Sequence, residues 1–573
     1  MGAGGGPAKI FGKVEIMSLT RRNFVFGAAA ASAGAAAGML GCSAPAQQSS
    51  AAAASSAAEE SSASADAAAS AEASASAEAA ASAAPASHNP TSTETCDIVV
   101  VGSGTAGLCC AVRAKQLGAN VILLEKTGMF GGSSNYAEGI GALNSFMHKE
   151  QDQEFDLNEA FLRIQDYHHW GSESSVLHHF LENSGATIDW LHNECGINFF
   201  KTAVTAPTSY PSWHLVADKD GNVMRELEGF FQPMLAYAES LDLDMRLKNP
   251  ATGLIVDGGT VKGVYVQGEN GEYAIEADSV VLATGGWANN AEMCEEFAHV
   301  DHSRITNWGA PGRDGDGITW ARELGAELHF PGNIMYASTA IPGQTEFEEP
   351  AGWIFTWSPG LRVNDKAQRF FNEALMADFS QAGNAIINEN AVYTIIDQAY
   401  LDYCTKEALP VSLDSLGPDY IMGEPFTIGI EAVAKAVEDG RIFKTDTIEE
   451  LAGKLGLDAA ALAKTIEEYN ACAEAGADPV FGCPPEALVP VETAPFYGVL
   501  NQPAMFATVG GVRSNENFQV LKTGGDIIPG LFALGGDNST YCGAGYDVGI
   551  MAGSQQGWCA TGGRLVAEFL FDK

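Results

Sequence analysis

The chain of 573 residues carries 72 acidic and 31 basic side chains, which gives a formal net charge of −41 at pH 7. This excess of negative charge argues against nucleic acid as a partner, because the phosphate backbone would be repelled. The length allows two or three domains around a large buried core.

The eleven cysteines indicate no metal or haem site. The sequence contains no C-x-x-C, no C-x-x-C-H and no zinc-type grouping of cysteine with histidine. We therefore expect no metal, no c-type haem and no iron–sulfur cluster bound by this chain. Cys109 and Cys110 fall within a predicted helix, where we expect them to be small buried apolar residues. No stretch after the N-terminal region is long and apolar enough to span a bilayer.

Residues 1–42 have the features of an export signal. Arg21-Arg22 precede a weakly apolar, alanine-rich segment, as in twin-arginine signals, which direct folded proteins across the membrane. Leu40-Gly41-Cys42 also resembles a lipobox, in which Cys42 would be lipidated. The sequence therefore predicts an extracytoplasmic protein with a lipid anchor on the outer face of the cytoplasmic membrane. The alternatives to lipidation are simple cleavage of the signal and an uncleaved anchor.

Residues 43–94 consist almost entirely of alanine, serine and glutamate. Such a segment cannot bury enough apolar surface to offset the loss of chain entropy, so it is predicted to be a disordered tether. A flexible coil of about 50 residues spans roughly 40 Å. That reach would let an anchored enzyme meet a neighbouring redox protein.

A dinucleotide-binding motif follows the tether. The β-branched run Asp97–Val101 predicts a buried strand, and Gly102-Ser103-Gly104-Thr105-Ala106-Gly107 matches G-x-G-x-x-G at the start of a helical pattern. A second strand at residues 120–124 ends in Glu125, close to the spacing at which an acidic residue meets a ribose hydroxyl. Gly102 suits the tight turn, Gly104 the approach of a pyrophosphate, and Gly107 close helix–strand packing. The helix N-terminus would add amide donors for the phosphates.

Further elements follow in order. Residues 155–245 predict mainly amphipathic helices, and residues 253–256 and 261–267 predict strands. Residues 278–286 predict another buried strand that ends in a glycine turn. Asp314-Gly315-Asp316-Gly317 precedes a predicted helix at residues 318–324.

Five motifs together carry a family resemblance: the glycine-rich start, GGSS at 131–134, ATGG at 283–286, GDG at 315–317 and IPGLFALGGD at 528–537. From about residue 95 to the C-terminus the chain resembles the FAD-dependent fumarate reductase/succinate dehydrogenase flavoproteins. The resemblance implies an α/β fold with a Rossmann-like FAD-binding domain, formed by residues 95–333 and 500–573. An inserted α+β capping domain at residues 334–499 would cover the substrate, which should lie between the two.

A helix pair within residues 446–470 is typical of that capping domain. Asp446 and Asp458 are suitable N-cap residues, with Glu449 three positions after the first. The expected buried stripe consists of Leu451, Leu455, Leu462 and Ile466.

The resemblance also implies the cofactor contacts and the mode of attachment. Succinate dehydrogenase-type members bind FAD covalently through a histidine just after the GG turn. No histidine lies between Met129 and Asn144, so we expect the FAD to be held non-covalently. The expected contacts are Gly102, Gly104, Thr105, Ala106, Gly107, Glu125, Lys126, Gly131, Gly132, Ser133, Ser134, Gly139, Thr284, Gly285, Gly286, Asp316, Gly536 and Asp537.

The substrate end departs from the fumarate reductases. The motif Arg369–Glu373 is present, but Ala377 stands where the proton-delivering arginine is expected. Ala507 replaces a histidine, and Tyr546 replaces a late arginine. Because carboxylates are recognised by arginine forks or comparable cations, these changes argue against fumarate as the substrate.

The stretch Tyr541–Gly545 resembles the Y-x-G-x-G of ketosteroid dehydrogenases in the same superfamily. There, a tyrosine hydroxyl and a glycine amide hold the ketone oxygen of a cyclic enone. Adding hydride to an enone places negative charge on that oxygen, and two preorganised donors stabilise it. Tyr541 and the Gly545 amide are the candidate pair. Alternatively, Tyr541 and Tyr546 only line the flavin wall.

The proton for the substrate carbon has four candidate donors. Tyr546 is the first choice, because it occupies a family substrate position; Asp378, Tyr336 and His214 are the others.

These observations predict an exported FAD-dependent reductase of an activated C=C bond, of the enone or acrylate type, in a small molecule. It would act as a terminal reductase of anaerobic respiration, with an external c-type cytochrome as the electron donor. One alternative is a ketosteroid-like dehydrogenase working in the oxidative direction. The other is a flavin-holding ligand-binding or electron-relay protein without turnover.

Overall fold

The computed structural model describes residues 88–205, 208–221, 228–345, 347, 349–409 and 425–572. The predicted export signal, with Arg21, Arg22 and Cys42, lies outside these residues, as does most of the predicted tether. Within the described part of the chain, no helix combines the length and apolar character needed to cross a membrane.

The predicted nucleotide motif belongs to an eight-stranded sheet. Its main path runs β18 (Gln519–Leu521), β19 (Ile527–Ala533), β9 (Gly271–Leu282), β1 (Thr93–Val101), β2 (Val121–Leu124) and β6 (Asp244–Arg246). Strand β1 is parallel to both neighbours, with Val99 opposite Ile122 on one side and Val280 on the other. The predicted strands at 253–256 and 261–267 are β7 (Ala251–Asp257) and β8 (Thr260–Gly268), an antiparallel pair that joins the sheet through β9.

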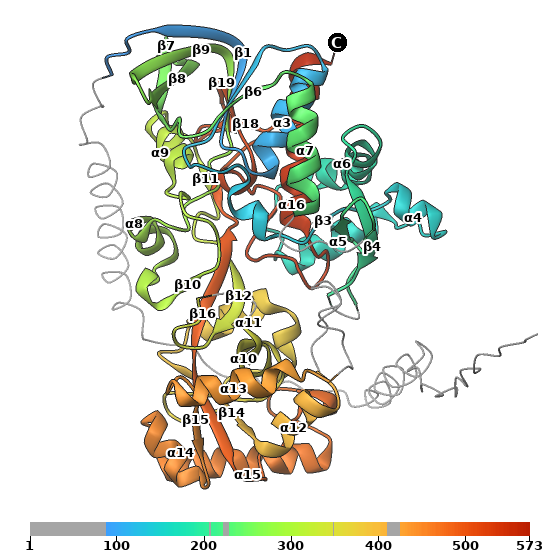
Figure 1. The fold of residues 1–573 in the computed structure, drawn as a ribbon, viewed down its shortest axis with the longest axis vertical. Helices are drawn as coiled ribbons and strands as arrows, with labels where there is room; N and C mark the ends of the chain where they lie inside the picture. The colour runs from blue at the N-terminus through green and yellow to red at the C-terminus, as the bar shows by residue number, and fades with distance from the viewer. Residues whose placement is uncertain are drawn as a thin grey trace, which may run out of the picture. The chain divides into compact units, whose positions relative to one another are not determined.

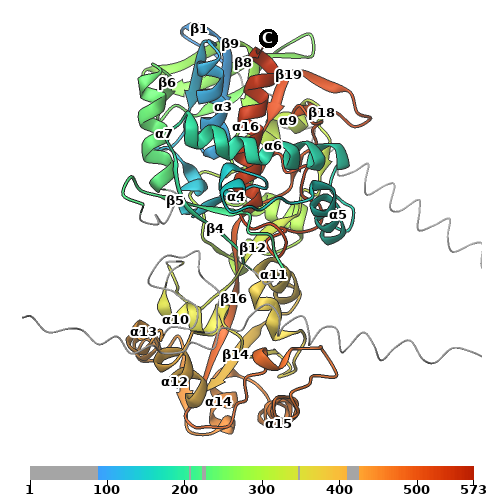
Figure 2. The ribbon, with the colours of Figure 1, turned by 90° about the vertical axis from the view of Figure 1, so that its right-hand side faces the viewer.

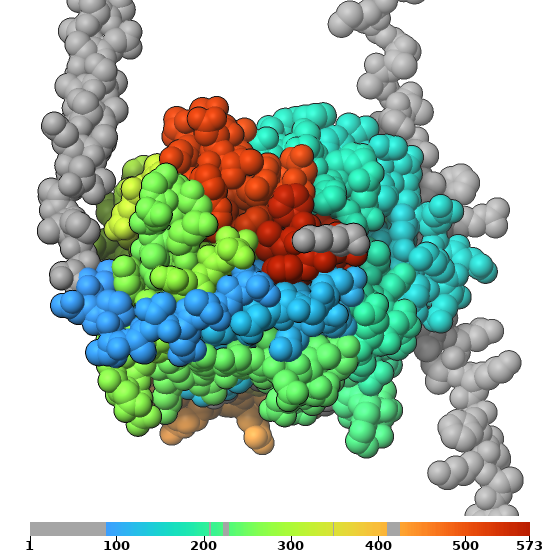
Figure 3. All heavy atoms as spheres, turned by 90° about the horizontal axis from the view of Figure 1, so that it is seen from above, coloured from blue at the N-terminus to red at the C-terminus, as the bar shows by residue number. Residues whose placement is uncertain are grey.

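The first and last helices of the described chain pack tightly against each other. Helix α3 (Thr105–Gln116) follows β1, and α16 (Ser554–Phe571) ends the described chain. Their colours, blue and red, lie side by side in Figures 1 and 3. A Cβ at Gly563 of α16 would lie 2.4 Å from the Ala106 carbonyl oxygen, so only glycine permits this approach. As predicted, Cys109 and Cys110 are fully buried in this core.

Residues 139–240 contain the predicted helices and also an unpredicted sheet. The helices are α4 (Phe146–Glu150), α5 (Leu157–Tyr167), α6 (Ser174–Asn193) and α7 (Glu228–Ser240). The sheet consists of β3 (Gly139–Gly141), β5 (Trp213–Ala217) and β4 (Asn198–Ala203). Its strands are short and pair only with one another, so they leave little periodic signal in the sequence.

The capping region is built on a six-stranded sheet. Its strands are β10 (Thr306–Asn307), β12 (Ile334–Ala340), β13 (Leu361–Asn364), β14 (Val392–Asp397), β15 (Phe443–Thr445) and β16 (Phe496–Thr508). The helices here are α10 (Pro350–Gly352), α11 (Phe379–Ile387), α12 (Gln398–Lys406), α13 (Ile428–Glu438), α14 (Ile448–Leu455) and α15 (Ala459–Ala475). The remaining α-helices and strands are α8 (Ala291–Met293), α9 (Asp316–Glu323), β11 (Leu328–His329) and β17 (Gly511–Val512).

Strand β16 continues through the predicted domain boundary. It pairs with β14 and β15 through residues 496–501, and with β12 and β10 through residues 502–508. Figures 1 and 2 show this strand running from the helices α14 and α15 toward the eight-stranded sheet. The predicted boundary between residues 499 and 500 therefore falls inside a single strand.

The predicted cap helices form α14 and α15, with one correction. Helix α14 is capped by Thr447, whose hydroxyl accepts the Glu450 amide at 3.2 Å, so the prediction of Asp446 as its N-cap is wrong by one residue. The prediction for α15 is confirmed, because the Asp458 carboxylate accepts the Ala461 amide at 2.7 Å. The predicted stripe of Leu451, Leu455, Leu462 and Ile466 is buried.

We expect two glycine-to-alanine changes to act in opposite directions. A Cβ at Gly557 of α16 would lie 1.9 Å from the Gly141 carbonyl oxygen, so Gly557→Ala forces the helix off β3. This should lower the free energy of unfolding by roughly 1–3 kcal/mol. Gly453 of α14 has no atom within 4 Å of such a Cβ. There, alanine should raise the free energy by about 0.4–1 kcal/mol, because it restricts the unfolded chain. Denaturant unfolding measures the free energy of unfolding of both variants. Equal changes in the two variants would contradict the close contact between Gly557 and β3.

Candidate active site

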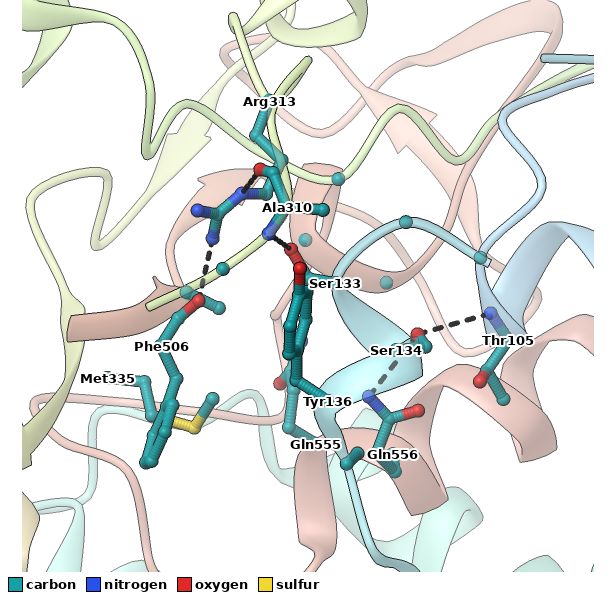
Figure 4. Close-up of a pocket in the computed structure, with 18 of the residues that line it drawn as sticks. Thr105, Ser133, Ser134, Tyr136, Ala310, Arg313, Met335, Phe506, Gln555 and Gln556 are labelled. Carbon is teal, nitrogen blue, oxygen red and sulfur yellow. Dashed lines mark hydrogen bonds between the residues drawn. The ribbon is translucent and has the colours of Figure 1, made fainter. Parts of the chain in front are cut away.

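A cavity of about 590 Å³ extends from the β1–α3 turn to the capping region. Figure 4 shows part of its lining, contributed by segments that are far apart in the sequence. One end is rich in glycine and small polar residues, and the other in aromatic side chains.

The glycines of the β1–α3 turn bring two backbones into contact. Gly102 has φ +106°, and a Cβ there would lie 2.1 Å from the Ala283 carbonyl oxygen at the end of β9. A Cβ at Gly107 would lie 1.9 Å from the Gly102 carbonyl oxygen. Gly104 lines the cavity, and a Cβ there would lie at ordinary contact distances from the Ser134 hydroxyl oxygen, 3.5 Å, and the Gly131 carbonyl oxygen, 3.7 Å, so it would add bulk at the cavity wall. The turn is a cradle in which a side chain would occupy the place of a ligand.

The N-terminus of α3 is directed to this cradle. Gly104 is the N-cap and provides no side-chain cap, while the Thr105 amide donates to the Ser134 hydroxyl at 3.3 Å. The Thr105 hydroxyl is buried and has no hydrogen-bond partner among the described residues. A helix N-terminus that carries a partial positive charge and whose N-cap residue has no side chain is suited to phosphate. These residues therefore fit the diphosphate of a dinucleotide.

Two charged groups follow β2. The Glu125 carboxylate accepts the Ser103 hydroxyl at 2.6 Å and the Thr127 amide at 2.8 Å, so it is fixed at the edge of the cavity. This carboxylate is the group that would accept a ribose hydroxyl. Lys126 pairs with Asp314 at 2.8 Å and Asp316 at 2.6 Å. Its charge is thus compensated within the protein.

The GGSS segment ties three parts of the site together. Gly131 has φ +108° and leads into the short 3-10 helix Gly132–Tyr136. Ser133 accepts the Ala310 amide at 3.0 Å, and Ser134 accepts the Gln556 side-chain amide at 3.3 Å (Figure 4). Both serines therefore hold the walls of the cavity in place.

Asp537 supports the ATGG turn from behind the cavity. Its buried carboxylate accepts the Thr284 amide at 2.5 Å, the Thr284 hydroxyl at 2.8 Å and the Gly286 amide at 3.0 Å. Burial raises the pKa of Asp537 to about 6. Asp537 thus positions residues that line the cavity.

The predicted cofactor residues gather at one site. Gly107, Gly286 and Asp537 are not part of the lining. The other predicted contacts do line the cavity: Gly102, Gly104, Thr105, Ala106, Glu125, Lys126, Gly131, Gly132, Ser133, Ser134, Gly139, Thr284, Gly285, Asp316 and Gly536.

Arg313 is a lining residue that the sequence analysis missed. Its guanidinium donates to the carbonyl oxygens of Ala310 at 2.9 Å and Phe506 at 2.6 Å (Figure 4). It also donates to the side chains of Asn289 and Asn307. Burial lowers its pKa to about 10. The guanidinium fastens the 309–313 loop to β16. Nothing in the sequence separates this arginine from a surface residue.

The structure does not assemble the predicted oxyanion pair at the cavity. Tyr541 is 0% exposed and packs against Phe180 and Trp558, and its hydroxyl donates to Gln555 at 3.0 Å. Gly545 is also buried outside the lining. Neither group is part of the described lining, because the loop after β19 turns the Tyr541 ring into the core; their role toward a substrate stays a prediction.

The four proton-donor candidates have different surroundings. Tyr546 lines the cavity, and its ring stacks on Phe379 at 6.2 Å between centroids. His214 is fully buried beside the Ser145 hydroxyl at 2.7 Å, and burial lowers its pKa to about 3. Asp378 caps α11, and Tyr336 is packed in the core near β16. Of the four, the structure brings only Tyr546 to the described lining.

A cradle for a dinucleotide that opens into an aromatic chamber defines a flavin-dependent oxidoreductase. The sequence from residue 97 to residue 549 matches the family model described as FAD binding domain. The match spans more than half of the chain, so the chain belongs to this family and binds FAD.

Three known proteins show the range of the similarity. A vinyl phenol reductase from Lactiplantibacillus plantarum is 32% identical over 478 residues, which cover 82% of this chain and 94% of the relative. A urocanate reductase from Eggerthella lenta is 28% identical, over 77% of this chain and 70% of the relative. The open conformation of a flavocytochrome c3 fumarate reductase superposes with a TM-score of 0.63 at 24% identity, covering 84% and 79% of the two chains. The protein is an FAD-dependent oxidoreductase.

We expect Gly102→Ala to abolish FAD retention, because its Cβ would collide with the Ala283 carbonyl and open the cradle. Gly118→Ala is the matched control. It carries similar backbone strain, with φ +90° against +106°, but no atom lies within 4 Å of its Cβ. Absorbance of bound flavin per mole of purified protein measures the effect. Equal loss of flavin in both variants would show that backbone strain alone is responsible.

Proposed function

We propose that the protein reduces a C=C bond conjugated to an aromatic ring or carbonyl group in a small, uncharged organic molecule. The observation that carries this proposal is the wall opposite the nucleotide cradle. Six aromatic residues line the cavity there, and we call them the aromatic wall: Trp308, Phe347, Trp353, Trp357, Phe379 and Phe506.

The aromatic wall is continuous from Trp308 to Tyr546. Phe347 contacts Trp308, Trp353, Trp357 and Phe506, with ring centroids 6.1, 5.3, 5.5 and 5.1 Å away. Phe379 then contacts Phe506 at 5.9 Å and Tyr546 at 6.2 Å. Offset and edge-on ring contacts of this kind favour a planar, ring-bearing guest.

Charge at the substrate end supports an uncharged guest. Ala377, Ala507 and Tyr546, which replace cationic residues of the fumarate reductases, all line the cavity. Arg313 and Lys126 also line it, but their donors are engaged within the protein. A carboxylate bound there would lose its hydration without gaining a free cation, which is costly.

Tyr546 is our proposed proton donor. Bound FAD supplies hydride chemistry, so the protein must hold the substrate and deliver one proton to the adjacent carbon. Burial raises the pKa of Tyr546, which keeps the phenol protonated until the substrate carbon takes the proton. The 32% identity to a vinyl phenol reductase supports the proposed class of substrate, since vinyl phenol combines an aromatic ring with a C=C bond and has no carboxylate.

The finer biological role is also a proposal. The twin-arginine pattern at Arg21-Arg22 supports export, and the lack of a histidine after the GG turn supports non-covalent FAD. A c-type cytochrome is the proposed electron donor, because the net charge of −41 would attract a basic redox partner. The fold shared with a flavocytochrome is consistent with this choice. The role would be a terminal step of anaerobic respiration.

The substrate assignment predicts a pattern of flavin re-oxidation. Protein reduced by viologen under anaerobic conditions should be re-oxidised by vinyl phenols or aryl enones, and much more slowly by fumarate. Trp357→Leu removes part of the aromatic wall and should raise KM roughly tenfold, about 1.4 kcal/mol. Trp170→Leu is the control, since Trp170 is 59% exposed and away from the lining. Preference for fumarate, or equal effects of the two variants, would contradict the proposal.

The export proposal predicts that Arg21→Lys with Arg22→Lys leaves the precursor, with bound FAD, in the cytoplasm. The twin-arginine route requires the paired guanidinium groups, and both arginines lie outside the residues that the structure describes. Cell fractionation with immunoblotting measures this, and Lys13→Arg serves as a control outside the pair. Unchanged export of the double variant would exclude this route.

A further inference from the structure

A buried acid that plays no part in the site described above follows Tyr546 directly in the chain. Asp547 is 0% exposed, and its Oδ1 accepts the Ser554 hydroxyl at 2.5 Å. Its Oδ2 has no hydrogen-bond partner among the described residues. A buried, unpartnered carboxylate oxygen is costly, which favours the protonated acid. Burial accordingly raises the pKa of Asp547 to about 7.

Ser554 connects this acid to the cavity. It is the first residue of α16, and its neighbours Gly553 and Gln555 line the cavity. Ser554 and the Gly553 backbone lie close enough to Tyr546 to lower its pKa, which opposes the larger effect of burial. Ser554 also lies 3.4 Å from the Tyr541 hydroxyl. One hydroxyl therefore adjoins both the cavity tyrosine and the buried acid.

A second acid, Asp378, lies close to the segment that carries Asp547. Asp378 of α11 accepts the Tyr167 hydroxyl at 2.9 Å and the side-chain amide of exposed Gln381 at 3.1 Å. Its Oδ2 would lie 2.4 Å from a Cβ at Gly549, so this carboxyl abuts the segment that carries Asp547.

The groups facing Asp547 come from every element packed around it. They are Asp378 of α11, Tyr167 of α5, Ser554 of α16, and Tyr541, Cys542 and Tyr546 of the loop after β19. Asp547 makes no salt bridge with any described lysine or arginine. Every titratable neighbour in this group is an acid that is neutral or negative.

We propose that Asp547, acting through Ser554, is the proton reservoir that recharges Tyr546 during turnover. This inference rests on the proposed function, in which Tyr546 donates to the substrate. The reduced cofactor provides the hydride, and the Tyr546 O–H bond breaks as the new C–H bond forms. For the relay, the Ser554 O–H turns from Asp547 Oδ1 to the Tyr546 oxygen, and the acid proton, carried on Oδ1, then points to the Ser554 oxygen. As Ser554 gives its proton to Tyr546, it takes the proton of Asp547, so Ser554 stays neutral. The resulting Asp547 carboxylate regains a proton from solvent on the side of Asp378 and Tyr167. Asp547 is thus a positioning and relay residue and does not touch the substrate.

Asp547→Asn tests the relay, because it preserves size and an acceptor for Ser554 but removes the acidic proton. We expect kcat at pH 7 to fall about 100-fold, with KM changed less than about threefold. The wild-type kcat should decline as the pH rises above 7, where Asp547 loses its proton, and the variant should lack this transition. Asp397→Asn, at a buried N-cap carboxylate of the cap, should retain the wild-type profile.

Infrared titration provides a readout independent of turnover. A carboxylic-acid C=O band should disappear as the pH is raised through about 7 in the wild-type protein and be missing in Asp547→Asn. Wild-type kcat and pH profile in Asp547→Asn would overturn the relay. So would a loss of bound flavin with unchanged kcat per flavin, since that result indicates a purely structural acid.

Ser554 variants keep the test decisive if Asp547→Asn does not fold. Ser554→Ala should lower kcat as Asp547→Asn does, and Ser554→Thr, which restores a hydroxyl, should recover most of it. Equal rates in the two Ser554 variants would overturn the relay.

Tyr546→Phe separates the two proposals: full activity in that variant would refute Tyr546 as the donor, and the relay with it. A titrating Asp547 band in protein that no C=C compound re-oxidises would refute the proposed function, while confirming the protonated acid.

Discussion

The contact between the β1–α3 turn and the end of β9 is the constraint on which the site depends. A Cβ at Gly102 would lie 2.1 Å from the Ala283 carbonyl oxygen, so the two backbones touch without side chains between them. This approach places the N-terminus of α3 beside the ATGG turn, and the Asp537 carboxylate then fixes that turn through Thr284 and Gly286. The cofactor cradle is therefore made of backbone, and its tolerance for substitution is correspondingly small.

The other end of the cavity is formed by side chains on and around strand β16, whereas the cradle is formed by backbone. Strand β16 pairs with cap strands at one end and passes the cavity at the other, where Phe506 and Ala507 line it. The strand is continuous, so one element joins the cap strands to the cavity lining. Arg313 fastens the 309–313 loop to the Phe506 carbonyl of this strand. The aromatic wall is thus held by sheet pairing and a buried guanidinium, and a planar guest would meet a preformed surface.

The sequence was informative wherever function is carried by backbone geometry over a few consecutive residues. The glycine turn, GGSS and Glu125 could be placed because each spacing specifies its own conformation. Tyr541 could not be placed in this way, since the direction of its ring is decided by packing against Phe180 and Trp558, which are distant in sequence. Arg313 gave no signal for the same reason: its partners Phe506 and Asn289 are brought together only by the fold. The N-cap of α14 shifted from Asp446 to Thr447 because either side chain can cap, and the tertiary position of the helix selects one.

The described lining offers a substrate no unpaired arginine or lysine, and this bears both on the charge of the substrate and on the protonation of Tyr546 and Asp547. A guanidinium near Tyr546 and Asp547 would favour their charged forms, lowering the pKa of both groups, and would also attract a carboxylate substrate. In this cavity the guanidinium of Arg313 donates to the carbonyl oxygens of Ala310 and Phe506. Burial raises the pKa of Tyr546 and brings the pKa of Asp547 to about 7. Neutral acids are then the groups able to hold a proton beside the substrate. The proposed uncharged substrate and the proposed delivery of a proton by Tyr546 therefore depend on the same three positions, Ala377, Ala507 and Tyr546.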